Sequence, residues 1–189
     1  DEAKAIQKEF SVIEKPVVID LKKAHLGLVG EKSVIHEQIK ALICQLTFSH
    51  SYHDLEIIAI YDEAYQEDFQ WMRWYPHFKI HTVNSVAMIN SENKRDQILG
   101  SLYQILKDRK QKEEESKKES TFLPHFLFLI DEPKWIMDHS IMEYLEKEGY
   151  NLGFSIIYTS HLRANLPENI GTIAMLKNSE DGLLLIDER

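Results

Sequence analysis

The chain has 189 residues, of which 43% are hydrophobic and 28% charged, as expected for one globular domain with a sizeable core. Its 31 acidic and 22 basic residues give a formal charge of -9, which argues against a surface that grips a nucleic-acid backbone. The single cysteine, Cys44, excludes a disulfide framework and favours a reducing compartment. Because no apolar run reaches the roughly 20 residues that span a bilayer, we expect no direct membrane insertion by these residues.

The first part of the chain predicts a strand, a glycine turn and a helix in succession. Residues 1–15 form a polar lead-in, and we expect the folded domain to occupy residues 16–189. A short apolar run ends at Gly30. The apolar residues that follow recur with the spacing of one helical face: Ile35, Ile39, Leu42, Ile43 and Leu46. This succession is the local arrangement of a phosphate-binding turn.

The turn itself lacks the residue types that bind phosphate. In the pattern G-x-x-x-x-G-K-[ST], glycines let backbone amides close around the phosphates, while the lysine and hydroxyl contact phosphate and magnesium. Counting from Gly30 places Ile35, His36 and Glu37 at the last three positions, where none of them supplies the required chemistry. A different register brings Lys32 nearby, but one residue early and without the second glycine. We therefore predict no nucleotide binding at this turn, with an unusual path of Lys32 to phosphate as the alternative.

The middle of the chain carries two groups of residues that admit a functional or a structural explanation. His50 and His53 could ligate a metal, but without a further clustered ligand we expect a helix end and a surface turn, and no metal site. Trp71 and Trp74 lie in the aromatic segment 69–78. We expect them to cover one end of the sheet, because large apolar side chains are mostly buried. A docking surface is the alternative, since exposed Trp residues dominate interface hot spots.

A long helix is predicted after Ser91, which is a suitable N-cap. Its first half carries apolar residues at helical spacing, whereas residues 107–120 are nearly all charged. Pairs of opposite charge there favour an exposed helix whose second half buries nothing.

The segment 126–130 is an unbroken apolar run, typical of a strand that is buried on both faces in a parallel sheet. It ends at Asp131 and Glu132, and ligands of open α/β sheets lie at the carboxyl ends of the strands. A second buried run ends at Thr159, and residues 172–187 predict a closing hairpin. The sequence therefore predicts a single α/β domain, with a mainly parallel sheet and helices on both faces.

Segments 27–30, 46–54, 71–77 and 124–132 together resemble the EssC/YukB coupling proteins of bacterial type VII secretion, which belong to the FtsK/SpoIIIE class. The similar part is the cytosolic module that precedes the conventional ATPase domains. The resemblance implies a P-loop-NTPase-like (RecA/FtsK-like) fold. It also implies that the Thr159 strand lies between the strands that end at Gly30 and Asp131.

By this resemblance, Asp131 and Glu132 match the acidic pair that orients magnesium and the attacking water, and Thr159 matches the sensor strand. The departure from the family pattern is the triplet Ile35-His36-Glu37. We therefore predict no catalytic residue, no bound metal and a degenerate nucleotide site at these positions: Gly30, Ile35, His36, Glu37, Asp131, Glu132 and Thr159.

The resemblance further implies a non-catalytic module of a membrane-anchored secretion motor, which links the membrane part to active ATPase domains at the cytoplasmic face of the cell membrane. Mg-ATP is expected for those other domains, and no cofactor for this one. The expected partners are other domains and subunits of the secretion machine, and exported helical-hairpin proteins through the parent protein, with no nucleic acid. A weak but genuine ATP-binding or hydrolysing domain of the same motor is the alternative.

Overall fold

The computed structural model describes residues 18–22, 25–115, 121–148, 150–168, 170–178 and 182–186. The predicted lead-in, residues 1–15, and the charged residues 116–120 lie outside these ranges. The strands are β1 (Leu26–Val29), β2 (Leu55–Ile60), β3 (Lys79–Ile80), β4 (Ser85–Val86), β5 (Met88–Ile89), β6 (His125–Ile130), β7 (Phe154–Ser160), β8 (Thr172–Leu176) and β9 (Gly182–Ile186). The α-helices are α2 (Lys32–Ser49), α3 (Gln66–Phe69), α4 (Glu92–Glu115) and α5 (Met142–Lys147). The short 3₁₀ helices are η1 (Glu63–Tyr65), η2 (Gln70–Trp74), η3 (Pro76–Phe78), η4 (Pro133–Trp135), η5 (Tyr150–Leu152) and η6 (Arg163–Asn165).

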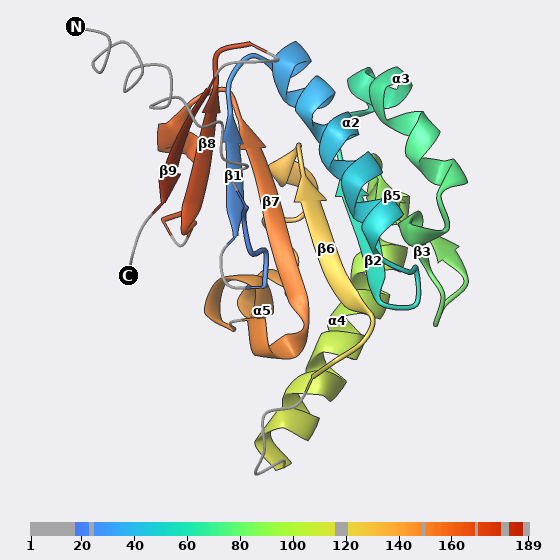
Figure 1. The fold of residues 1–189 in the computed structure, drawn as a ribbon. Helices are drawn as coiled ribbons and strands as arrows, with labels where there is room; N and C mark the ends of the chain where they lie inside the picture. The colour runs from blue at the N-terminus through green and yellow to red at the C-terminus, as the bar shows by residue number, and fades with distance from the viewer. Residues whose placement is uncertain are drawn as a thin grey trace, which may run out of the picture.

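Seven strands form one sheet in the order β5-β2-β6-β7-β1-β8-β9, as Figure 1 shows. All neighbouring strands are parallel except β8 and β9, which form the predicted antiparallel hairpin. Strand β7 pairs with both β6 and β1, so Thr159 lies on the strand between those that lead to Asp131 and Gly30. The mainly parallel α/β fold and the implied strand order are both confirmed.

Helices cover both faces of the sheet, which explains why the segment 126–130 is apolar at every position (Figure 1). Alternate residues of a strand point to opposite faces. On one face α2 packs on the sheet through Ile35, Ile39, Ile43, Leu127 and Leu129. On the other face α4 and α5 pack through Leu99, Leu102, Leu145, Phe126 and Phe128. None of the described helices combines the length and the apolarity required to cross a membrane.

The charged half of α4 contains one buried side chain, so the prediction that this half buries nothing is wrong at Arg109. The guanidinium donates to the carbonyls of Leu152 (2.9 Å), Gly153 (3.1 Å) and Pro124 (2.7 Å), and it lies 4.4 Å from the ring centroid of Phe126. Burial lowers the pKa of Arg109 to about 10. The side chain therefore joins α4 to the segments that precede β6 and β7, by donating to three of their backbone carbonyls.

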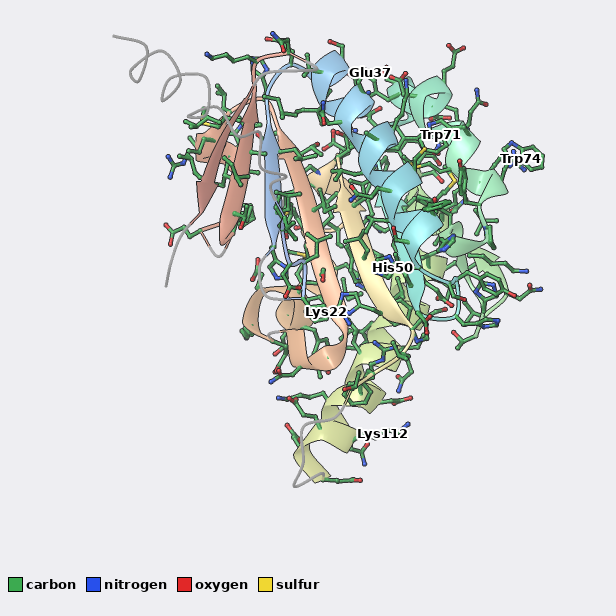
Figure 2. The ribbon with its side chains drawn as sticks, viewed as in Figure 1. Lys22, Glu37, His50, Trp71, Trp74 and Lys112 are labelled. Carbon is green, nitrogen blue, oxygen red and sulfur yellow. The ribbon has the colours of Figure 1, made fainter. Side chains whose placement is uncertain are left out.

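Replacing Arg109 with Met should destabilise the fold by about 2–4 kcal/mol, because three carbonyls lose their charged donor in a buried site. The free energy of unfolding in urea measures this loss. Lys112→Met is the matched control, since Lys112 is exposed on the same helix (Figure 2), and it should change the free energy by less than about 0.5 kcal/mol. Equal losses in the two variants would contradict the assigned role of Arg109.

Candidate functional site

The turn between β1 and α2 consists of two residues, Gly30 and Glu31, and therefore forms no loop around a phosphate. The amide of Gly30 donates to the carbonyl of Ser160 at 3.1 Å, which removes it from phosphate binding. A Cβ atom at Gly30 would lie 2.7 Å from the carbonyl oxygen of Leu176. Glycine is required at this position because β8 approaches closely.

The triplet that replaces the phosphate-binding residues occupies the first turns of α2. Ile35 is 1% exposed and packs in the core against the sheet. His36 is 5% exposed and points toward the end of β6. Glu37 is exposed and accepts a hydrogen bond from Lys40 at 2.8 Å (Figure 2). Of the three side chains, only His36 contacts the carboxylate at the end of β6, whereas Ile35 contributes an apolar wall to the cavity there.

The carboxylate of Asp131, with a fully buried side chain, is the centre of the site. Lys32 Nζ lies 3.2 Å from Oδ2, and His36 Nε2 lies 3.5 Å from Oδ1. The Thr159 hydroxyl donates to Oδ1 at 2.5 Å. We refer to Lys32, His36, Asp131 and Thr159 as the Asp131 cluster. Both oxygens of the carboxylate are thus occupied by side chains of the same protein.

A second carboxylate completes the surroundings of His36. Its Nδ1 lies 3.0 Å from Asp68 Oδ2, and the imidazole contacts the rings of Tyr65 and Phe69 edge-on. Burial by itself would lower the pKa of His36, but the close carboxylates of Asp131 and Asp68 outweigh burial and raise it. Burial would raise the pKa of Asp131, and the contacts of His36, Thr159 and Lys32 lower it instead. This arrangement favours an imidazolium between two carboxylates.

Glu132, the second acid of the predicted pair, lies outside the Asp131 cluster. Its carboxylate accepts from the amide of Lys134 at 3.3 Å, as a cap of the short helix η4. Between Glu132 and the cluster is a cavity of about 220 Å³, whose lining includes Lys32, Ser160 and His161. Ligand sites generally occupy about 300–1,000 Å³. The residues present therefore do not fit a magnesium-bound triphosphate: the cavity is small, and internal cations already neutralise Asp131.

The predicted histidine pair terminates a helix. His50 is the C-cap of α2, and its Nδ1 lies 3.1 Å from the carbonyl of Leu46. The rings of His53 and Tyr52 are tilted by 39° with their centroids 4.2 Å apart, and His77 Nε2 lies 2.8 Å from the carbonyl of His50. Across the described ranges, no three His, Cys, Asp or Glu side chains are grouped so that they could hold a metal ion.

The two tryptophans differ in their burial, and the prediction that both cover the sheet is wrong for Trp74. Its side chain is 80% exposed and projects away from the sheet (Figure 2). Trp71 is half-buried, and its Nε1 donates to the carbonyl of Asp68 at 2.7 Å. Phe69 and Met72, each 1% exposed, fill the core in this segment. The alternative, a docking surface that includes Trp74, remains a prediction.

The sequence suggested Lys32 as a cation near the site, but the role of His36 and the contribution of Asp68 were missed. The sequence did contain a signal for the role of His36, because Lys32 and His36 are four residues apart and so lie on one face of α2. Asp68 follows 32 residues later on α3, and no local pattern relates it to His36.

Stability should depend on pH through His36. Its pKa is raised above the ordinary value of 6.5 in the folded state, so its stabilisation is present below pH 6.5 and lost as pH rises through the folded pKa. The difference in unfolding free energy between the native protein and His36→Gln should be largest near pH 6 and shrink toward pH 9.

Urea unfolding of both proteins at several pH values measures this difference. Burial lowers the pKa values of His25 and His125 to about 4, so these side chains destabilise the fold as pH falls below 6.5. Both are present in the two proteins, and their effect cancels in the difference. A difference that is the same at pH 6 and pH 9 would contradict a charged His36.

No family model matches the chain. Among curated proteins, it is 35% identical over 190 residues to the ESX secretion system protein EccC of Geobacillus thermodenitrificans, a match that covers 100% of the chain and 13% of that protein. It is 37% identical to YukB of Bacillus subtilis, over 92% of the chain and 12% of YukB. It is 32% identical to the type VII secretion system protein EssC of Staphylococcus aureus, over 100% of the chain and 13% of EssC.

Solved structures confirm the fold. A structure of EssC ATPases 2 and 3 from Geobacillus thermodenitrificans gives a TM-score of 0.70 at 13% identity, and the match covers 88% of this chain and 38% of that one. Thermomonospora curvata EccC, solved as ATPases 2 and 3 in complex with a signal sequence peptide, gives 0.55 at 14% identity, over 87% of this chain and 32% of that one. The conjugation coupling protein TcpA gives a TM-score of 0.52 at 15% identity, and the match covers 86% of this chain and 51% of that one.

The curated relatives are far longer than this chain, which spans about 13% of the first of them. Identities of 32–37% over 92–100% of the chain exceed what a shared fold alone produces. The chain is therefore homologous to one segment of the EssC, EccC and YukB proteins of type VII secretion, and it belongs to their family.

Proposed function

We propose that this chain is a non-catalytic ATPase-fold module of a membrane-anchored type VII secretion motor, which links the membrane part to active ATPase domains and supports protein export. The observation that carries the proposal is the Asp131 cluster. In a P-loop ATPase, an acid in this position acts on magnesium and the attacking water. Here Lys32, His36 and Thr159 occupy both oxygens of the carboxylate.

The turn between β1 and α2 supports the same conclusion. Phosphoryl transfer depends on preorganised donors and cations that stabilise the charge of the transferring group. The short turn has no cradle of amides, and the lysine position of the motif is occupied by His36, which lies between Asp131 and Asp68. A triphosphate would have to displace these carboxylates from the imidazolium and enter an edge where acidic side chains remain.

A contrast between two comparisons supports a role beside the catalytic domains. The chain is 35% identical to the full-length Geobacillus thermodenitrificans protein, but only 13% identical to the solved ATPases 2 and 3 of EssC from the same organism. The homologous segment therefore differs in sequence from the part of that structure that it matches, which is 38% of the solved chain. This contrast favours the module that precedes the conventional ATPase domains.

As partners we propose the other domains and subunits of the secretion machine, with exported helical-hairpin proteins contacted through the parent protein and Mg-ATP bound by other domains. The net charge of -9 favours proteins over nucleic acid as partners. The exposed Trp74 is a candidate contact for such a domain. For the whole protein we propose a position at the cytoplasmic face of the bacterial cell membrane.

A weak but genuine ATP-binding or hydrolysing domain is the second candidate function, and one observation favours it. The Lys32 side chain is 37% exposed and lines the small cavity together with Asp131 and Glu132. A rotation of this side chain away from Asp131 would present its ammonium group to a phosphate. In that case Lys32→Ala should abolish turnover.

Mg-ATP should leave the protein unchanged. A ligand at about 100 times its Kd stabilises the folded state by about 2.7 kcal/mol, so even a Kd of ~20 µM would raise the unfolding midpoint clearly at ~2 mM Mg-ATP. We expect no change in the midpoint and no binding heat in isothermal titration. Asp131→Ala is the matched variant: a micromolar affinity that disappears in this variant would overturn the non-catalytic assignment.

Asp131 should stabilise the fold. Asp131→Asn removes the charge that faces the buried His36 and the partly exposed Lys32, so we expect a loss of about 1–3 kcal/mol in urea unfolding. Glu132→Gln, the adjacent acid outside the cluster, should cost less than about 1 kcal/mol. When an acid is kept for catalysis, its replacement often leaves the stability of the fold unchanged or increases it. A neutral or stabilising Asp131→Asn would therefore favour the second candidate.

A further inference from the structure

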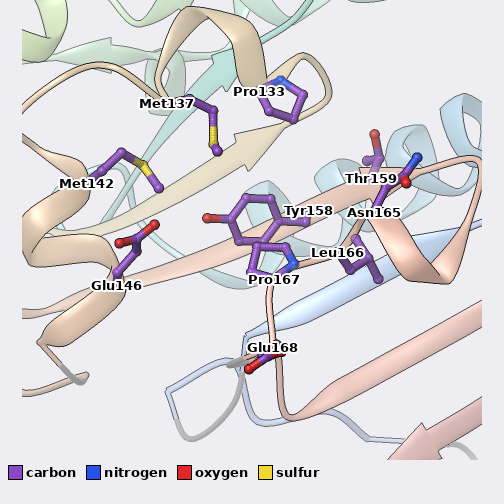
Figure 3. Close-up of a pocket in the computed structure, with 10 residues that line it drawn as sticks. All are labelled: Pro133, Met137, Met142, Glu146, Tyr158, Thr159, Asn165, Leu166, Pro167 and Glu168. Atoms are coloured by element: carbon purple, nitrogen blue, oxygen red, sulfur yellow. The ribbon is translucent and has the colours of Figure 1, made fainter.

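A cavity of about 500 Å³ opens beside α5, on the face of the sheet opposite to α2. Figure 3 shows the side chains around it, with the Tyr158 ring at its centre and the thioethers of Met137 and Met142 directed toward that ring. We refer to this space as the methionine cavity. Its apolar lining comes from Pro133, Met137, Met142, Tyr158, Leu166 and Pro167.

The methionine cavity adjoins the 220 Å³ cavity at the Asp131 cluster, and the two share Pro133, Thr159 and Asn165. The hydroxyl of Thr159 is committed to Asp131. At about 500 Å³ the methionine cavity is more than twice as large as the 220 Å³ cavity at the cluster, and it falls within the range of ligand sites. The methionine cavity is therefore large enough for a ligand, whereas the cavity at the degenerate nucleotide site is not.

The lining favours an apolar group of variable shape. Methionine side chains are unbranched and polarisable, so they adapt to different apolar partners and are common on surfaces that bind peptides. Met137 is 57% exposed and Met142 is 7% exposed, so one of them lies at the mouth and the other lies deeper. Such a surface accepts a leucine, methionine or phenylalanine side chain.

The charges of the methionine cavity are acidic. Glu146 and Glu168 are its charged lining residues, and both are exposed. Within the described part of the chain, neither carboxylate forms a salt bridge. Burial and the charge of Glu146 raise the pKa of Tyr158 to about 12, so its hydroxyl stays protonated at neutral pH. A cationic ligand is attracted to this rim, whereas phosphate is repelled.

We propose that the methionine cavity binds a short segment of a partner protein, which inserts one large apolar side chain beside Met137 and Met142 and places a lysine or arginine against Glu146 and Glu168. The acidic rim excludes a nucleotide. A second copy of this chain carries the same charge of -9 and is a poor match. The inference goes beyond the proposed function and does not rest on it, because Met137, Met142, Glu146 and Glu168 line only the methionine cavity and none of them belongs to the Asp131 cluster.

Selection from a phage-displayed library of random 12-residue peptides against the immobilised 189-residue chain tests the proposal. Selected peptides are then synthesised with a fluorescein label, and their affinity is measured by fluorescence anisotropy. We expect a consensus with a large apolar residue and a lysine or arginine within four positions of it. Affinity should fall by about tenfold or more in the double variant Glu146→Lys/Glu168→Lys, and also in Met137→Asp.

Glu143→Lys is the matched control, because Glu143 is exposed on the same helix but does not line the methionine cavity. It should change the affinity by less than about twofold, with circular dichroism showing that all variants fold. The proposal is overturned if no peptide is enriched, if the consensus is acidic or lacks the apolar residue, or if the double variant binds as tightly as the control. Displacement of the peptide by ATP would overturn it too. So would dimerisation in sedimentation velocity that Met137→Asp abolishes.

Discussion

The buried carboxylate of Asp131 imposes the main constraint on this structure. A charge that is removed from water is costly unless nearby groups replace its hydration, and Lys32, His36 and Thr159 do so here. In an ATPase of this fold, magnesium and nucleotide supply part of that compensation when they bind. In this protein side chains of the same chain supply the compensation, and it joins α2, β6 and β7 at the edge of the sheet.

The features that could be predicted from the sequence are those with a local pattern. The apolar run of β6 and the helical spacing of α2 are direct consequences of burial, and together they indicated a parallel sheet covered on both sides. The absence of a phosphate-binding pattern after Gly30 was equally visible, because its chemistry depends on residue type and spacing. The strand order came from the family resemblance.

The features that were missed depend on tertiary contacts. Arg109 stands among charged residues and looks like its neighbours, yet its guanidinium reaches carbonyls that are 15 to 44 residues away. Trp74 was expected in the core because tryptophan is usually buried, but the neighbouring Phe69 and Met72 fill that space. No periodicity distinguishes these outcomes, since each depends on what the rest of the chain brings to the same place.

The two-residue turn between β1 and α2 also has a mechanical consequence. Long loops at a nucleotide site let the first helix and the switch segments respond to hydrolysis, and such motion requires slack in the backbone. Gly30 and Glu31 provide no such spare length of backbone. The amide of Gly30 donates a hydrogen bond to the carbonyl of Ser160, and α2 begins directly after Glu31. A shift of α2 relative to β1 would therefore have to break the contact of Gly30 with β7, so the helix and the sheet are coupled directly.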